Sequence, residues 1–307
     1  MQTSPLLPLA APVETISLAG WTTAAHYGDI PAEIDAVHRH VGLIDQTIRG
    51  RLAVGGPDRG RWLNKIVSNE TAALQPGEGC RALLLSTKGR ITCDLRVYAL
   101  ADSLLLETAF DTADGLLEVL RGYVLFGDQV TVTDRRQELC QLGVHGPAAA
   151  ALLRRLTGLE VSSLSRYGVA AKDSLMVART DDFGPAGYDL FAPLERAAEL
   201  WEGLRAEARP FGWRAAEVLR LEAGRPRWGA ELTPDYLPLE AELSEALSHT
   251  KGCYPGQEVV ARMRDRGHAN RLLRRLAVDG TVLPQRGATL TVAGSPKPVG
   301  LVTSVAR

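Results

Sequence analysis

The feature that most constrains the fold is a short unit, occurring twice, in which a strand runs through glycine and proline into a helix. Residues 54–57 (VGGP) open the first copy and residues 144–147 (VHGP) open the second, and a leucine, Leu63 or Leu153, follows six residues after each proline. Proline fits the first turn of a helix, where its missing N–H removes no hydrogen bond. Two such units predict a duplicated α+β element, although the match is too short to prove duplication by itself.

The rest of the chain also alternates between helical and strand periodicity. We expect helices at residues 30–42, 57–67, 112–125 and 194–207. We expect strands at residues 43–46, 50–56, 81–86, 89–100, 103–109, 173–179 and 187–193, with a loop at 180–186. After Gly267 the pattern changes to three short strands bounded by glycine, at residues 271–280, 287–294 and 299–305. Residues 269–307 are therefore expected to form a small β-barrel-like module that packs against the rest, because about forty residues rarely fold alone.

The expected strand at residues 89–100 has a regular alternation of side chains. Its apolar face carries Ile91, Cys93, Leu95 and Val97. Its polar face carries Thr92, Asp94, Arg96 and Tyr98. Successive side chains of a strand point to opposite faces, so the polar set lies together. This face is either the wall of a pocket or a solvent-exposed face with a weak Asp–Arg ion pair, and the residues alone favour the second slightly.

Two further segments combine aromatic and charged side chains. Tyr188 and Asp189 begin a strand after a glycine-containing loop, a common place for binding residues. Farther along, Arg220 is expected on a strand face with Glu222, and these are followed by Arg225, Arg227 and Trp228. A flat ligand with an acidic tail would use an aromatic ring to stack on and arginines to bind its carboxylates. An ion-pair cluster beside a tryptophan is the alternative.

Cys253 lies between two glycines in the segment KGCYPGQE, residues 251–258. We expect Pro255 in the first turn of a helix that ends at Gly267, which would place Cys253 just before a helix N-terminus and beside Lys251. Both neighbours favour a thiolate. A buried, inert cysteine in a tight turn is the alternative, and the local sequence does not decide between them.

The composition limits the classes of protein that fit. The chain has 45% hydrophobic and 23% charged residues and a net charge of −1, so no general attraction to nucleic acid or membrane is implied. The arginine-rich run at 262–275 suggests a nucleic-acid partner as a third hypothesis, and the neutral overall charge makes that hypothesis the weakest. The four cysteines have no zinc or iron–sulfur spacing, so we expect no bound metal. The N-terminus lacks a basic signal-peptide region and no run is long enough to span a membrane, which favours a reducing cytoplasm.

Several segments together resemble the folate-binding family of the glycine-cleavage T-protein and its YgfZ-type relatives. In order, from about His26 to Val260, these are HYGDIPAE, VGLIDQTIRGRLAVGGPDR, LLLSTKGRITCDLRVY, GYDLF, RLEAGRPRWGAEL, LPLEAEL and KGCYPGQEVV. The last segment is the most specific, because it is similar to the signature of the YgfZ branch. The resemblance implies interleaved α+β modules, one of them ferredoxin-like, in a folate-binding core of residues 1–268, followed by the short C-terminal module.

The resemblance also implies roles for single residues. Asp94 matches the acidic residue beside the reactive nitrogen of tetrahydrofolate. Asp189 matches a glutamate that binds the pterin edge but is one methylene shorter, so a water is expected between it and the ligand. Tyr188 matches an aromatic of the pocket, and Arg220 matches the arginine directed at the folate tail. The remaining candidates for the folate site are Tyr98, Trp228 and Lys251.

Two functions follow from the resemblance. The first is a tetrahydrofolate-binding protein of the YgfZ type that supports assembly or repair of iron–sulfur clusters, with Cys253 as a functional thiol and with assembly proteins or client enzymes as partners. The alternative is an aminomethyltransferase that passes a one-carbon unit from a carrier-bound amine to tetrahydrofolate, with Asp94 assisting at the attacking nitrogen. The sequence leaves open whether the protein turns over a substrate at all.

Overall fold

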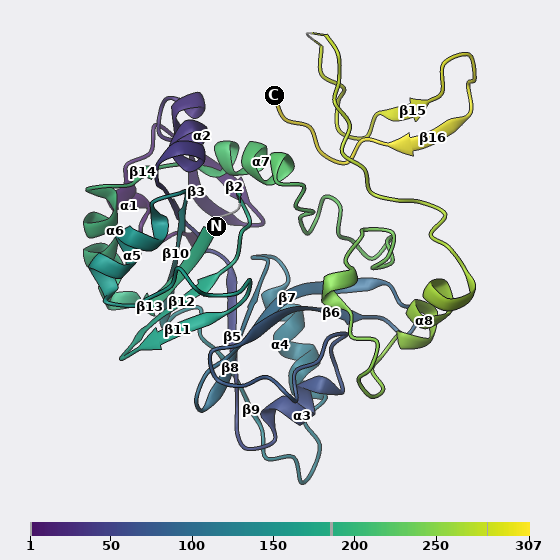
Figure 1. Ribbon diagram of the computed structural model, residues 1–307, viewed down its shortest axis with the longest axis horizontal. Helices are drawn as coiled ribbons and strands as arrows, with labels where there is room; N and C mark the ends of the chain where they lie inside the picture. The colour runs from purple at the N-terminus through teal and green to yellow at the C-terminus, as the bar shows by residue number, and fades with distance from the viewer. Residues whose placement is uncertain (1, 185–186, 281) are drawn as a thin grey trace.

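Two β-sheets, whose strands interleave along the chain, form the body of the molecule in a computed structural model that describes residues 2–184, 187–280 and 282–307 (Figure 1). The expected loop at 180–186 is thus described only as far as Gly184. The mixed α+β fold expected from the sequence is confirmed. A three-stranded sheet at the N-terminus and a two-stranded sheet near the C-terminus complete the architecture.

The first of the two main sheets is five-stranded and antiparallel, in the order β6-β7-β8-β5-β9. Its strands are β5 (Gly50–Gly55), β6 (Gly79–Leu85), β7 (Ile91–Ala99), β8 (Ser103–Thr108) and β9 (Thr131–Asp134). The helices α3 (Arg59–Asn64) and α4 (Ala113–Gly122) share one apolar core with these strands. Cys93, Leu95 and Val97 face that core, so the alternation expected for this strand is confirmed.

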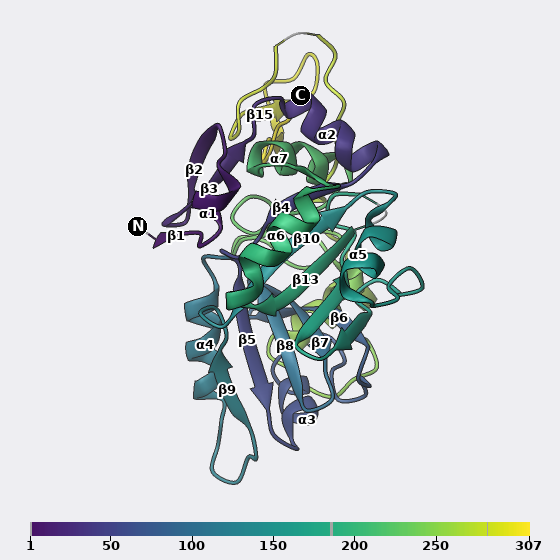
Figure 2. The ribbon, with the colours of Figure 1, turned by 90° about the vertical axis from the view of Figure 1, so that its left-hand side faces the viewer.

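The second main sheet is six-stranded, in the order β11-β12-β13-β10-β4-β14. Figure 2 labels three of its strands, β4, β10 and β13. Its strands are β4 (Gly42–Asp45), β10 (Leu139–His145), β11 (Val169–Lys172), β12 (Leu175–Arg179), β13 (Gly187–Pro193) and β14 (Arg209–Pro210). One apolar core joins it to α5 (Ala149–Thr157) and α6 (Ala197–Arg205), and a second core joins it to α2 (Ile30–Arg39) and α7 (Trp213–Glu222).

The remaining elements lie at the ends of the chain or between the sheets. The N-terminal sheet contains β1 (Gln2–Thr3), β2 (Glu14–Leu18) and β3 (Trp21–His26), with the short helix α1 (Leu7–Ala10). The later elements are η1 (Leu194–Arg196), η2 (Ser244–Ala246), α8 (Gln257–Arg266), β15 (Thr289–Thr291) and β16 (Pro298–Leu301). The last two strands extend away from the body (Figure 1).

The duplicated strand–glycine–proline–helix unit is confirmed, with one copy in each main sheet. The strand β5 leads to α3, and β10 leads to α5. Gly56 (φ +97°) and Gly146 (φ +125°) make the turns in the left-handed region, which a side chain rarely adopts. Leu63 and Leu153, six residues after each proline, are fully buried in the two separate cores.

Three details of secondary structure differ from the expectation. Arg220 and Glu222 lie at the end of the helix α7 and not in a strand, because Ala215, Ala216 and Leu219 recur at helical spacing and are buried together. The helix α8 begins at Gln257, so Pro255 precedes its first turn. Of the three C-terminal strands, the one expected at 271–280 is not formed, and among the described residues β15 and β16 do not close into a barrel.

The turn at Gly146 gives a direct test of the duplicated unit. A Cβ atom added there would lie 2.4 Å from the carbonyl oxygen of His40, at a backbone angle that only glycine adopts easily. We expect Gly146→Ala to lower the free energy of unfolding by about 2 kcal/mol or more, measured by urea denaturation. Gly115→Ala is the control, since a Cβ atom there meets nothing and alanine should stabilise α4 by up to about 1 kcal/mol. Equal effects of the two substitutions would contradict the proposed constraint at this turn.

Candidate functional site

A cavity of about 810 Å³, counted together with its solvent-filled mouth, lies where the two main sheets meet α7. Seven arginines line it, namely Arg49, Arg81, Arg96, Arg166, Arg220, Arg225 and Arg227. Its carboxylates are Asp94, Asp182 and Glu217, and its aromatic side chains are Phe110, Tyr167, Phe183, Trp213 and Trp228. Charged and flat groups thus face one another across a single space.

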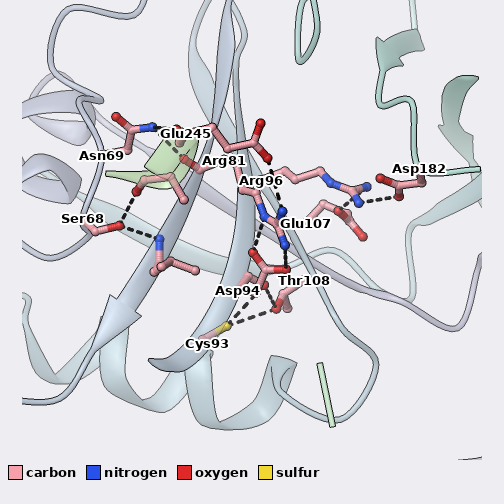
Figure 3. Close-up of polar contacts among 12 residues, drawn as sticks. Ser68, Asn69, Arg81, Cys93, Asp94, Arg96, Glu107, Thr108, Asp182 and Glu245 are labelled. Carbon is pink, nitrogen blue, oxygen red and sulfur yellow. Dashed lines mark hydrogen bonds and ion pairs between the residues drawn. The ribbon is translucent and has the colours of Figure 1, made fainter. Parts of the chain in front are cut away.

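Asp94 lies on the polar face of β7 and lines this cavity together with Arg96, whereas Thr92 and Tyr98 of the same face do not. The Nε and Nη2 atoms of Arg81, from the neighbouring strand β6, each donate a hydrogen bond of 2.8 Å to a different oxygen of Asp94 (Figure 3). Glu245 lies 3.3 Å from the Nη1 atom of Arg81. Burial alone would lower the pKa of Arg81, but Asp94 outweighs it and the pKa is raised. Arg81 therefore stays charged and fixes the orientation of the Asp94 carboxylate.

Arg96, two residues farther along β7, lines the cavity and joins the two main sheets through its ion pairs (Figure 3). Its Nη1 atom lies 3.1 Å from the buried carboxylate of Glu107 and 3.5 Å from Asp189, and its Nη2 atom pairs with Asp182. Glu107 also pairs with Arg49. Burial would raise the pKa of Asp182, but Arg96 and Arg49 outweigh it and hold the pKa below its usual value. The cluster is therefore a set of mutually neutralising charges.

Asp189 lies behind the cavity wall and not on it. The side chain is fully buried and accepts hydrogen bonds from the Nε2 atoms of Gln46 (2.7 Å) and Gln141 (3.0 Å). Burial raises its pKa to about 7. Gln46, which donates to Asp189, lines the cavity in its place, so Asp189 is separated from the cavity by an amide.

Neither of the tyrosines expected at the site lines the cavity. Tyr188 precedes Asp189 on β13 and therefore points to the opposite face, into the core shared with α5 and α6. Tyr98 is fully buried, with its ring centroid 5.9 Å from that of Phe191. Trp228 lines the cavity, as expected, and the other aromatic lining residues include Phe110 and Trp213, whose centroids are 6.0 Å apart in an edge-on arrangement.

Lys251 and Cys253 also lie outside the cavity. The Nζ atom of Lys251 donates hydrogen bonds to the carbonyl oxygens of Val67 (2.6 Å), Asn69 (2.9 Å) and Asn64. Burial lowers its pKa to about 8. Through these contacts Lys251 connects its own loop to the segment at the end of α3. Cys253 is exposed and lies four residues before the first residue of α8, so the helix N-terminus expected beside its thiol is not there.

Several lining residues were missed by sequence reasoning. Arg81 lies on the adjacent strand of a tight hairpin, opposite Arg96 and diagonal to Asp94, and the pairing of those two expected strands was the signal that could have identified it. Gln46, Phe110 and Trp213 come from segments far apart in the sequence, and no local pattern connects them. In the ranges that the structure describes, no group of three or more His, Cys, Asp or Glu side chains could hold a metal ion. No helix in those same ranges is long and apolar enough to cross a membrane.

Comparison with known proteins gives consistent results. Residues 9–251 match the model of the GCVT N-terminal domain. An aminomethyltransferase of Desulforamulus reducens is 29% identical over 307 residues (96% of this chain, 83% of that protein), and one of Geobacillus kaustophilus is 32% identical over 304 residues (95% and 82%). The crystal structure of the glycine cleavage system aminomethyltransferase T from Bartonella henselae superposes with a TM-score of 0.80 at 26% identity, covering 87% of this chain and 75% of that one.

These findings correct the first function expected from the sequence. The curated relatives carry the name aminomethyltransferase over almost the whole chain, and the structural neighbour is a glycine cleavage protein. The assignment to the YgfZ branch and the role in iron–sulfur cluster assembly are therefore wrong, and nothing supports the associated client partners. The segment KGCYPGQE indicated the YgfZ branch, but it is short, whereas the similarity to aminomethyltransferases covers almost the whole chain.

The buried carboxyl of Asp189 predicts a specific pH dependence of stability. Its pKa in the folded state, about 7, lies above the ordinary 3.8, so its stabilising contribution is complete below about pH 4 and is lost as the pH rises to 7. We expect Asp189→Asn to remove this loss, which amounts to at most about 1.4 kcal/mol per pH unit. Urea denaturation of both proteins from pH 4 to pH 8 measures the difference, with the exposed Asp102→Asn as control. Parallel profiles for Asp189→Asn and the wild type would contradict the raised pKa.

Proposed function

The chain belongs to the GCVT N-terminal domain family, and we propose that it is an aminomethyltransferase that passes a one-carbon unit from a carrier-bound amine to tetrahydrofolate. The observation that carries the proposal is the carboxylate of Asp94, which faces the cavity in a fixed orientation between arginines and aromatic rings. Tetrahydrofolate, which the resemblance implied, fits such a lining because it combines a flat ring system with an acidic tail.

The lining residues suggest how the ligand would be held. Trp228 offers an aromatic face for the flat rings, and Gln46 offers an amide whose orientation is set by the buried Asp189. Arginines in the lining provide positive charge for the tail. Of the folate-binding residues expected from the sequence, Asp94, Arg220 and Trp228 line the cavity, and we assign Asp94 and Trp228 to the ligand.

Asp94 has the clearest chemical role in this proposal. Bound tetrahydrofolate supplies the nitrogen that accepts the carbon unit. A carboxylate beside this nitrogen stabilises the positive charge that develops there as the new bond forms. Because Arg81 binds both oxygens of Asp94, the carboxylate needs no reorganisation when that charge appears. We therefore assign Asp94 to charge stabilisation and Arg81 to its positioning.

The remaining parts of the proposal concern the surroundings of the protein. We take the donor to be an amine on a carrier, and the structural neighbour is an aminomethyltransferase of the glycine cleavage system. All four cysteines are free, and Cys93 and Cys140 are buried, which is in keeping with the reducing cytoplasm expected from the sequence.

Substitution of Asp94 tests this role. We expect Asp94→Asn to lower kcat about a hundredfold or more, because the amide keeps the shape of the side chain but loses its charge. The assay is the release of ammonia from an aminomethyl-loaded carrier protein, which should require tetrahydrofolate. Asp114→Asn is the matched control, since Asp114 also pairs with an arginine, Arg136, but is 85% exposed.

Two outcomes would count against the proposal. If the wild type binds tetrahydrofolate but releases no ammonia from the loaded carrier, the protein is not an aminomethyltransferase. If Asp94→Asn retains wild-type kcat, the reaction does not depend on this carboxylate. Urea denaturation of the variant separates either result from a loss of folding, because Arg81 keeps Glu245 as its partner.

A further inference from the structure

The guanidinium of Arg220 has no hydrogen-bond donor left for a ligand. The side chain has five N–H groups. The Nε atom donates to Glu217 (2.9 Å), Nη1 donates to Glu231 (2.9 Å) and to the carbonyl oxygen of Arg225 (3.2 Å), and Nη2 donates to Ser304 (2.6 Å) and to the second oxygen of Glu217. The side chain is only 6% exposed. Arg220 therefore holds the end of α7, the following loop and the C-terminal segment together.

Arg225 lines the same cavity as Arg220, but most of its N–H donors are unused in the described part of the chain. Gly224 (φ +66°) turns the chain after α7, and the half-buried Arg225 lines the cavity just beyond this turn. Its Nε atom donates to the carbonyl oxygen of Asp181 at 3.3 Å, which fixes the base of the guanidinium. Among the residues that the structure describes, neither Nη1 nor Nη2 of Arg225 has an acceptor. Four N–H donors on a positioned, charged group are thus unused.

The other arginines of the cavity already face carboxylates. Six of the seven pair with an aspartate or glutamate, namely Arg49, Arg81, Arg96, Arg166, Arg220 and Arg227. Within the described residues Arg225 is the exception. Its charge is the one that a ligand anion can neutralise without separating an existing ion pair, and breaking a buried pair leaves an unpaired charge at considerable cost.

We propose that Arg225, and not Arg220, binds the glutamyl carboxylates of the folate tail. The inference rests on the proposed function, because it concerns the acceptor of that same site. Two terminal nitrogens of a guanidinium match the two oxygens of a carboxylate, so the contact is bidentate and selects for an anionic tail. Trp228, three residues farther on, lines the same cavity and would face the flat part of the ligand.

The test compares tetrahydrofolate with tetrahydropteroate, which has the same ring system but lacks the glutamate. Both are titrated anaerobically into the wild type, Arg225→Gln, Arg225→Lys and the control Arg121→Gln, which removes the same charge from an exposed position of α4. We expect the wild type to bind tetrahydrofolate about ten- to a hundredfold more tightly than tetrahydropteroate. Arg225→Gln should abolish this preference by weakening tetrahydrofolate binding alone. Arg225→Lys should keep part of it, and Arg121→Gln should keep all of it.

Each other outcome has a distinct meaning. If Arg225→Gln retains the wild-type preference, or weakens both ligands equally, the tail is bound elsewhere and the inference is overturned while the proposed function stands. If the wild type binds neither ligand, the proposed function itself fails. Thermal unfolding of Arg225→Gln confirms that the variant is folded, which we expect because the side chain makes a single hydrogen bond.

Discussion

The ion cluster around Arg96 is the interaction on which the arrangement of the cavity depends. Arg96 comes from the five-stranded sheet, whereas Asp189 comes from β13, an interior strand of the six-stranded sheet, and Asp182 from the loop that precedes β13. Glu107, fully buried, links this arginine to Arg49 in the connection between the sheets. Removing one member would leave an unpaired buried charge, so the sheets are held in one relative position. Arg225 and the aligned Asp94 can line one cavity only because that position is fixed.

Much of the fold could be predicted from the sequence, because it depends on local periodicity. The strand at Ile91–Ala99, its two faces and the duplicated unit all follow from spacing and from glycine and proline at fixed positions. The same rule could have been applied to Tyr188 and Asp189. Neighbours on a strand point to opposite faces, so both could not line one pocket directly. The family resemblance placed both Tyr188 and Asp189 at the site, although adjacent residues of one strand cannot both face it.

The rest could not be predicted because it depends on partners that lie far away in the chain. Arg220 is saturated by Glu231, Ser304 and its own helical neighbour, and nothing near position 220 reveals this. Lys251 is similar, since its acceptors lie more than a hundred residues earlier. For the same reason the segment KGCYPGQE suggests a reactive site when it is considered alone, whereas in the folded chain its Lys251 links two segments through hydrogen bonds. Similarity over the whole chain indicates an aminomethyltransferase, whereas the single motif indicated the YgfZ branch.

The separation of β4 and β5 into different sheets bears on how the chain folds as it is synthesised. All five strands of one sheet lie in the continuous stretch 50–134, so that sheet can form as soon as this stretch has left the ribosome. The strand β4 precedes this stretch, but its partners β10 and β14 follow it. It must therefore wait unpaired while about a hundred residues are added. The later sheet has the higher contact order, and its assembly is expected to set the folding rate.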